Sequence, residues 1–127
     1  MKRHLIISLL ALIMTACAVK DKQYYQAHPE ELQKALMGCP NQSPRYVSCS
    51  QLKSIALTFN ELASQLQANP QKFGNKILEL QQQIAQKKEQ LKNNPENKQE
   101  IQDALQKKQQ ELTDRLIMVK LFESPAR

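Results

Sequence analysis

The stretch that decides the fold is residues 77–122, ILELQQQIAQKKEQLKNNPENKQEIQDALQKKQQELTDRLIMVKLF. Its apolar residues recur at intervals of three, four and seven in two runs, which the segment Asn93-Asn94-Pro95 separates. Such spacing predicts two amphipathic helices of the coiled-coil kind, and the proline between them interrupts helical geometry. We expect one helix from about Gln71 or Lys76 to Lys92 and a second from about Glu96 to Phe122, packed as an antiparallel hairpin.

Each helix of this hairpin carries only a narrow apolar stripe. A lysine interrupts the first stripe at Lys87 or Lys88 and the second around Lys108. The stripes can form an internal core under the preceding helix, or a seam that self-association or a partner helix completes, and the sequence leaves both open. The apolar positions are Ile77, Leu80, Ile84, Leu91, Ile101, Leu105, Leu112, Leu116 and Val119.

A longer helix is predicted immediately before the hairpin, from about Gln51 to Ala68. Ser50 can cap its amino end, and Asn69-Pro70 ends it, because the residue before a proline avoids helical geometry. We expect this helix to pack across the hairpin through one apolar face. The residues of that face are Leu52, Ile55, Phe59, Leu62 and Leu66.

A short helix is predicted from Pro29 to Met37. Proline suits the first position of a helix, and the acids Glu30 and Glu31 suit the positive end of the helix dipole. Leucine and alanine then recur at helical spacing, and Gly38 is a natural stop signal. His28 should therefore lie at or near the helix cap.

Residues 1–17 have the pattern of a bacterial lipoprotein signal. Lys2 and Arg3 precede an apolar run, Leu5 to Met14, that is too short to span a bilayer, and small residues follow it. The segment Met14-Thr15-Ala16-Cys17 resembles the lipobox of bacterial lipoproteins. That resemblance implies a signal peptide at 1–16, diacylglycerol on the Cys17 sulfur and a further acyl chain on its amino group, which together anchor a protein firmly. The competing interpretation is an ordinary secreted protein in which Cys17 is incidental.

The residue after the lipidated cysteine bears on the choice of membrane. Residue 18 is Ala, whereas Asp at this place tends to retain lipoproteins of enteric-type bacteria in the inner membrane. By that resemblance, we expect a lipid anchor at the periplasmic face of the outer membrane rather than in the inner membrane.

The other two cysteines form a natural pair. Cys39 and Cys49 enclose residues 40–48, which are rich in turn formers, and an exported chain meets an oxidising compartment. A disulfide closing this loop would stabilise the fold by roughly 2.5–3 kcal/mol on the chain-entropy account. A structural zinc site needs four ligands, and His28 is the only histidine after the signal. We therefore expect a Cys39–Cys49 disulfide, no metal and no cofactor.

These elements predict an all-α fold. A short, disulfide-looped N-terminal module is followed by an amphipathic helix and a long antiparallel helical hairpin. By residue number, the expected divisions are a signal peptide at 1–16, a lipidated tether at 17–27, a module with the disulfide loop at 28–55, and a helical region with the coiled-coil-like hairpin at 51–127.

Charge and motif content argue against several function classes. The net charge of +6 falls to +4 when Lys2 and Arg3 leave with the signal, and the lysines alternate with Glu and Gln as on a solvated helix face. No aromatic residues interleave with a basic stripe, so nucleic-acid binding is not expected. The chain has no Gly-rich phosphate loop and no nucleophile elbow, and His28 has no evident partner nucleophile. We therefore do not expect an enzyme.

The first half of the chain, to near Ile55, carries a second resemblance. Tyr24-Tyr25, then His28-Pro29-Glu30-Glu31, then Cys39 and Cys49, together with the lipobox, resemble the EexN-type entry exclusion lipoproteins of conjugative plasmids. Members of that family act in the recipient cell envelope and block redundant DNA transfer from a donor with a related type IV secretion system. The resemblance implies interaction residues at Tyr24, Tyr25, His28, Pro29, Glu30 and Glu31, and no enzymatic activity. The long hairpin is not part of the family's pattern.

Three functional hypotheses follow. The first is a non-enzymatic envelope lipoprotein that acts by protein–protein contact, in exclusion or beside a type IV secretion or conjugation apparatus. The alternative is a structural or assembly scaffold of the outer membrane, with self-association through the hairpin, and an envelope enzyme inhibitor ranks below both. An exposed patch near Tyr24, Tyr25 and the cysteine loop favours the first hypothesis, and an exposed apolar seam on the hairpin favours the second.

Overall fold

The computed structural model describes residues 19–123 and contains five helices and no strand over that range. The predicted all-α class is confirmed, together with the disulfide loop and the packed helical pair. Cys17, the expected signal peptide and the last four residues lie outside the described residues. The helices are α1 (Lys22–Ala27), α2 (Pro29–Met37), α3 (Cys49–Ala68), α4 (Pro70–Lys92) and α5 (Lys98–Glu123).

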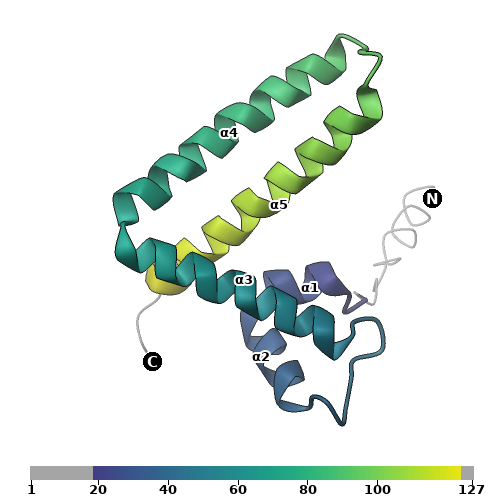
Figure 1. The fold of residues 1–127 in the computed structure, drawn as a ribbon, viewed down its shortest axis with the longest axis vertical. Helices are drawn as coiled ribbons and strands as arrows, with labels where there is room; N and C mark the ends of the chain where they lie inside the picture. The colour runs from purple at the N-terminus through teal and green to yellow at the C-terminus, as the bar shows by residue number, and fades with distance from the viewer. Residues whose placement is uncertain (1–18, 124–127) are drawn as a thin grey trace, which may run out of the picture.

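The helices form a body with a projecting hairpin (Figure 1). α4 and α5 run antiparallel beside each other, and α3 crosses them at the end where α4 begins and α5 finishes. α1 and α2 pack on α3 next to this crossing. The expected packing of α3 on the hairpin is therefore present at one end only, and residues 80–108, called the arm below, extend away from the body.

Local sequence signals explain where α2 and α3 begin. α2 has the bounds predicted for it, with Pro29 at its first position and acids in its first turn. α3 starts earlier than predicted, because Ser48 rather than Ser50 caps it. The Ser48 hydroxyl accepts a hydrogen bond from the backbone N–H of Gln51 at 3.1 Å, and the Gln51 side chain accepts one from the Ser48 N–H at 2.9 Å.

α1 was not anticipated, because residues 17–27 were expected to be a tether. Asp21 caps this helix by accepting a hydrogen bond from the backbone N–H of Tyr24 at 2.9 Å. Tyr25 points into the core and is 5% exposed. A helix this short is marginal by itself, so the burial of Tyr25 against its neighbours stabilises it.

The disulfide joins Cys39, just after α2, to Cys49, the first residue of α3. The loop that it closes also contributes to the core, because Val47 is only 2% exposed. The predicted bond is therefore confirmed. It fixes the end of α2 beside the start of α3, where both helices contribute to one apolar cluster.

One continuous core lies around α3. Leu52 is fully buried, and Phe59 and Leu62 on the same face are less than a tenth exposed. The cluster reaches across the predicted boundary between the N-terminal module and the hairpin. Its buried members are Tyr25, Leu32, Val47, Leu52, Ile55, Phe59, Leu62, Phe73 and Met118.

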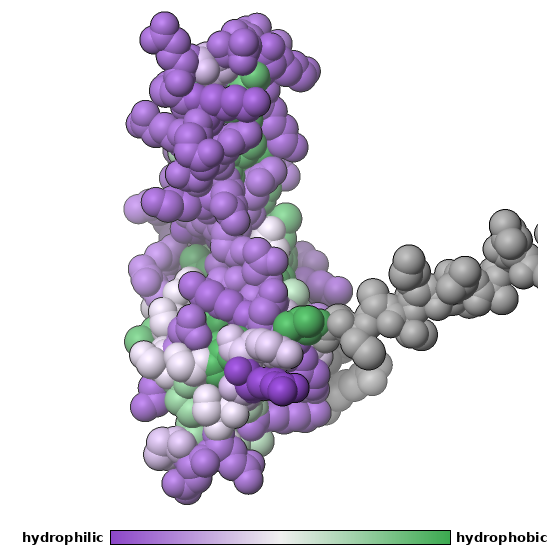
Figure 2. All heavy atoms as spheres, turned by 90° about the vertical axis from the view of Figure 1, so that its right-hand side faces the viewer, coloured by the Kyte–Doolittle hydropathy of each residue, from purple (hydrophilic) through white to green (hydrophobic). Residues whose placement is uncertain are grey.

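The arm has a much thinner interior. Leu80, Ile84 and Ile101 are buried between its two helices, and the Lys108 ammonium donates a hydrogen bond across the seam to the Gln83 side chain at 2.7 Å. Figure 2 shows hydrophilic side chains over most of the arm and apolar atoms gathered at the body. Within residues 19–123, no helix combines the length and the apolar character needed to cross a bilayer.

Removing the disulfide should lower stability without changing the helical fold. For Cys39→Ser/Cys49→Ser, we expect the free energy of unfolding to fall by about 2.5–3 kcal/mol, because the unfolded chain regains the freedom of the loop. Urea denaturation followed by far-UV circular dichroism measures this loss. The wild type in reductant should match the variant, and an unchanged unfolding free energy in both would contradict the prediction.

Two leucines of α4 allow a matched test of the seam. Leu80 is 1% exposed and Leu78 is 64% exposed. Leu80→Ala should lower the free energy of unfolding by about 2–3 kcal/mol. This is the lower part of the range for buried leucines, because a thin seam relaxes around the gap. Leu78→Ala should stay within about 0.5 kcal/mol of the wild type. If urea denaturation showed equal effects of the two substitutions, the face of α4 that carries Leu80 would not be the face packed against α5.

Candidate interaction surface

The residues of the sequence motif at 24–31 form one cluster where α1 meets α2. The Tyr24 and His28 rings stack with centroids 4.2 Å apart, and the His28 Nδ1–H donates to the Tyr24 backbone oxygen at 2.8 Å. The Lys20 ammonium lies 5.5 Å from the centre of the Tyr24 ring and pairs with Glu31 at 3.4 Å. Lys34 pairs with the other oxygen of Glu31 at 3.3 Å. Side chains from two helices and the preceding segment therefore share one surface.

The charges of this cluster support one another. Hydrogen bonds from Lys34 and Lys20 hold the pKa of Glu31 below its ordinary range. The same contact with Glu31, with a smaller contribution from Tyr24, raises the pKa of Lys20. Because all three groups are open to water, these ion pairs set the orientation of the side chains more than they stabilise the fold.

The structure separates the predicted interaction residues into surface and core. Glu30 is exposed, and Tyr24, His28 and Glu31 are half-buried. Tyr25 belongs to the core, where its ring packs edge-on against Tyr24 at 5.5 Å. Pro29 occupies the first position of α2. Pro29 is half-buried as well, so a partner that touches this surface meets every residue of the motif except the buried Tyr25.

A shallow groove runs beside the cluster, between α2 and the cysteine loop. Its volume is about 360 Å³, and its lining includes Glu31 and Lys34 from α2 and Gln42 and Pro44 from the loop. The disulfide ties one wall of this groove to the other, because it joins the loop's two ends. The groove brings the Tyr-Tyr and Pro-Glu-Glu motifs together with the cysteine loop on one face.

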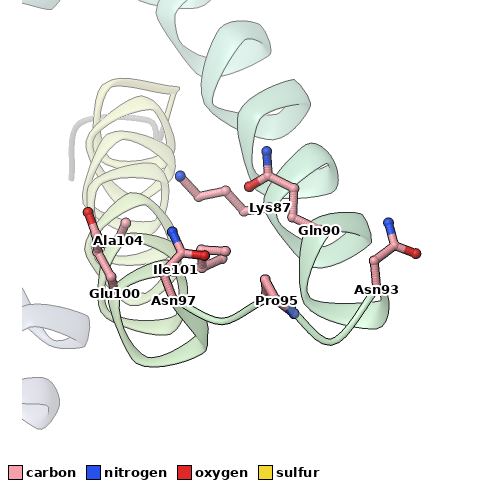
Figure 3. A pocket seen from close by; sticks show the side chains of 8 residues that line it. All are labelled: Lys87, Gln90, Asn93, Pro95, Asn97, Glu100, Ile101 and Ala104. Atoms are coloured by element: carbon pink, nitrogen blue, oxygen red, sulfur yellow. The ribbon is translucent and has the colours of Figure 1, made fainter.

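A second hollow, of about 450 Å³, opens at the tip of the arm. In Figure 3, Lys87 extends from α4 toward α5, and Pro95 lies in the turn between the two helices. Ile101, which is 8% exposed, closes its inner side. This hollow is the open end of the helical seam.

Asp114 of α5 is a buried carboxylate that the sequence patterns did not predict. It lines a cavity of about 60 Å³ that Lys22 and Gln26 of α1 and Ser54 and Thr58 of α3 also reach. Its Oδ1 accepts a hydrogen bond from the Gln110 side chain at 2.9 Å. Burial raises its pKa, and the Gln110 hydrogen bond and the charge of Lys22 offset part of that rise, while Glu111 adds to it.

The next residue, Arg115, is a second buried charge that was missed. Its side chain is 10% exposed, and its Nε donates to the Glu111 carboxylate at 3.1 Å. Its Nη2 donates to the Gln65 side-chain oxygen of α3 at 3.3 Å, and its guanidinium lies 4.8 Å from the centre of the Phe73 ring. Arg115 thus connects α3, α4 and α5.

A strict seven-residue repeat would have found Arg115. Counting in sevens from Ile101 gives Lys108, Arg115 and Phe122. Ile101 and Arg115 are buried and Lys108 is half-buried at the seam, whereas Phe122 is exposed. The predicted stripe instead passed through Leu116, which is 46% exposed, so the prediction was wrong there. The apolar pattern favoured leucine over arginine at neighbouring positions, although a long cationic side chain can bury its stem.

Among residues 19–123, no group of His, Cys, Asp and Glu has the arrangement of a metal site. Cys39 and Cys49 are held in the disulfide. Cys17, the expected lipid attachment point, lies outside the described residues.

The buried carboxylate predicts a pH effect on stability. Because the pKa of Asp114 is raised in the folded protein, its contribution is greatest at acid pH and is lost as pH rises through that pKa. Asp114→Asn should therefore have a larger free energy of unfolding than the wild type at neutral pH. This difference should shrink as the pH falls below the ordinary pKa of a carboxyl group. Urea denaturation at several pH values measures this difference.

A matched control lies on the same helix. Asp103 accepts a hydrogen bond from Gln99 at 2.9 Å with the same four-residue spacing, but it is exposed. Asp103→Asn should give no stabilisation at neutral pH, because water already solvates its carboxylate. A similar gain from both substitutions would mean that net charge, rather than burial, is responsible.

Comparison with known proteins returns no relative: the chain matches no protein-family model, no curated protein and no solved structure.

Proposed function

We propose that this chain is a non-enzymatic lipoprotein of the bacterial cell envelope that acts by protein–protein contact, in exclusion or beside a type IV secretion or conjugation apparatus. The observation that carries the proposal is the order of motifs: a lipobox ending at Cys17, then Tyr24-Tyr25, Pro29-Glu30-Glu31, Cys39 and Cys49. This order of motifs resembles that of the EexN-type exclusion lipoproteins.

The compactness of the motif region supports this proposal. Tyr24, His28 and Glu31 lie in one cluster, and the disulfide holds the adjoining loop against α2. A surface with Glu30 exposed and fixed ion pairs at its centre suits recognition of another protein better than catalysis. Tyrosine offers a partner a large contact area at little cost in conformational entropy.

The anchor defines where such contacts would occur. Lipidation at Cys17 places the membrane next to Val19 and α1, so the cluster at residues 20–34 lies close to the lipid surface. With Ala18 after the cysteine, this surface is the periplasmic face of the outer membrane. Two or more acyl chains hold a protein there without a membrane-spanning helix.

One observation favours the scaffold alternative. The arm extends from the body with its surface largely hydrophilic, as a spacer does (Figures 1 and 2). In that role the arm would set a distance between the membrane-anchored body and a second component. At 1.5 Å per residue, α4 alone is about 35 Å long.

Photo-crosslinking in the native envelope tests the proposal. A photoreactive residue at exposed Glu30 should trap components of a conjugation or secretion channel, identified by mass spectrometry. When the photoreactive residue is placed at exposed Gln33 instead of Glu30, the substitutions Glu30→Gln/Glu31→Gln should lower channel capture several-fold, because the surface loses its two acids.

A separate experiment tests the lipid anchor. Labelled palmitate should be incorporated by the wild type and not by Cys17→Ala, and the Cys17→Ala chain should leave the membrane fraction.

The control removes two acids elsewhere. Glu96→Gln/Glu100→Gln changes exposed acids at the tip of the arm and should leave capture unchanged. Capture that is lost only with the tip variant would support the scaffold alternative. Capture of this chain alone, or of general outer-membrane proteins, would sink the exclusion proposal.

A further inference from the structure

A further hollow lies away from the motif region, where α3 ends and α4 begins. It has a volume of about 670 Å³ and receives side chains from three helices. Gln65 comes from α3, Arg115 from α5, and Lys72, Phe73, Lys76 and Glu79 from α4. None of these residues belongs to the motifs on which the proposed function depends. It is called the α3–α4–α5 groove below.

The lining of this groove carries more cations than anions. Lys76 pairs with Glu79, the one acid of the lining, at 3.3 Å, and Arg115 pairs with Glu111 of its own helix at 3.1 Å, which leaves Lys72 as the uncompensated cation. In the part of the chain that the structure describes, the Lys72 ammonium makes no hydrogen bond and no ion pair. α4 also begins without an acid in its first turn, so no carboxylate of its own offsets the positive end of this helix.

Arg115 is held ready for an anion. Its bonds to Glu111 and Gln65 use two of the five N–H donors of a guanidinium and restrain the side chain, and its guanidinium lies 4.8 Å from the centre of the Phe73 ring. The side chain lines the groove while being 10% exposed, so it is already ordered and largely desolvated. An anion that binds there meets a fixed planar fork rather than a mobile chain.

We infer that the α3–α4–α5 groove binds an acidic peptide segment of a partner protein, with a carboxylate on Arg115 and Lys72. Ala68 and the aliphatic stems of Lys72 and Lys76 supply an apolar wall for the neighbouring side chain. The inference rests on the proposed protein-contact function and names the second surface through which such contacts occur.

Charge complementarity favours this occupant over phosphate-bearing ones. Glu79 at the groove repels a doubly charged phosphate more strongly than a singly charged carboxylate. A nucleic acid needs a track of cations and open aromatic faces, whereas Phe73 is 3% exposed and covered by Arg115. The volume of the groove suits a few peptide side chains.

The experiment measures fluorescence anisotropy of a labelled peptide, Glu-Leu repeated three times, with the full lipidated chain in mild detergent. The peptide should bind the wild type, and added salt should weaken binding. Lys72→Gln/Lys76→Gln should weaken it about tenfold, because two attractive charges leave the groove. The uncharged peptide, Gln-Leu repeated three times, should bind the wild type no more tightly than the acidic peptide binds Lys72→Gln/Lys76→Gln.

α4 offers a matched control with the same charge change. Lys88 and Lys92 have the same four-residue spacing, and Lys92 pairs with Glu89 at 3.2 Å as Lys76 pairs with Glu79. Lys88→Gln/Lys92→Gln should bind the peptide as the wild type does. Equal weakening by both variants, no binding by the wild type, or displacement by inorganic phosphate at peptide-like concentration would overturn the inference.

This test separates the groove from the proposed function. Absent peptide binding together with preserved capture of channel components at Glu30 would refute the groove alone. Peptide binding without capture of channel components would leave the groove in place and refute the exclusion proposal.

Discussion

Each of the other four helices within residues 19–123 packs on α3, and the rest of the described structure depends on that burial. Leu52, Ile55, Phe59 and Leu62 of α3 belong to one cluster with Tyr25 of α1, Leu32 of α2, and Phe73 and Met118 of the hairpin. A chain with so few apolar residues cannot build separate cores for a motif-bearing module and a hairpin. The module and the hairpin share one helix, α3, and therefore one core. The packing of this core sets the orientation of the motif surface relative to the arm.

The second constraint is the presence of charge inside that core. Asp114 and Arg115 are adjacent on α5 but serve different neighbours, because successive residues of a helix point about 100° apart. Asp114 faces the polar cavity beneath α1, whereas Arg115 reaches toward Gln65 and Phe73. An apolar residue at position 115 would pack the seam more simply. The guanidinium instead gives the crossing of three helices a directional contact, which fixes register as polar residues do in coiled coils.

Sequence patterns predicted the helices that carry strong end signals and an amphipathic face. Pro29 and Gly38 bounded α2, and the turn formers around Pro95 located the hairpin, whereas α1 was missed because six residues are too few for a periodic pattern. The one sequence signal for α1 was Asp21, a residue type that commonly caps the amino end of a helix. The disulfide followed from two cysteines left after the lipobox, a turn-rich segment between them and too few ligands for a zinc site. The α3–α4–α5 groove could not be predicted, because it arises where three helices meet and the predicted stripe passed through Leu116 rather than through the buried Arg115.

The thin interior of the arm has a consequence for how the protein moves. Leu80, Ile84 and Ile101 are the buried apolar residues that hold residues 80–108 together, so separating the helices from the tip exposes little apolar surface. The body loses its whole cluster at once when it opens. We therefore expect amide protection against hydrogen exchange to decline in steps from α3 toward the turn at Asn94, as in proteins that open in cooperative units. A binding event on the arm should damp these openings, and a binding event on the body should leave them unchanged.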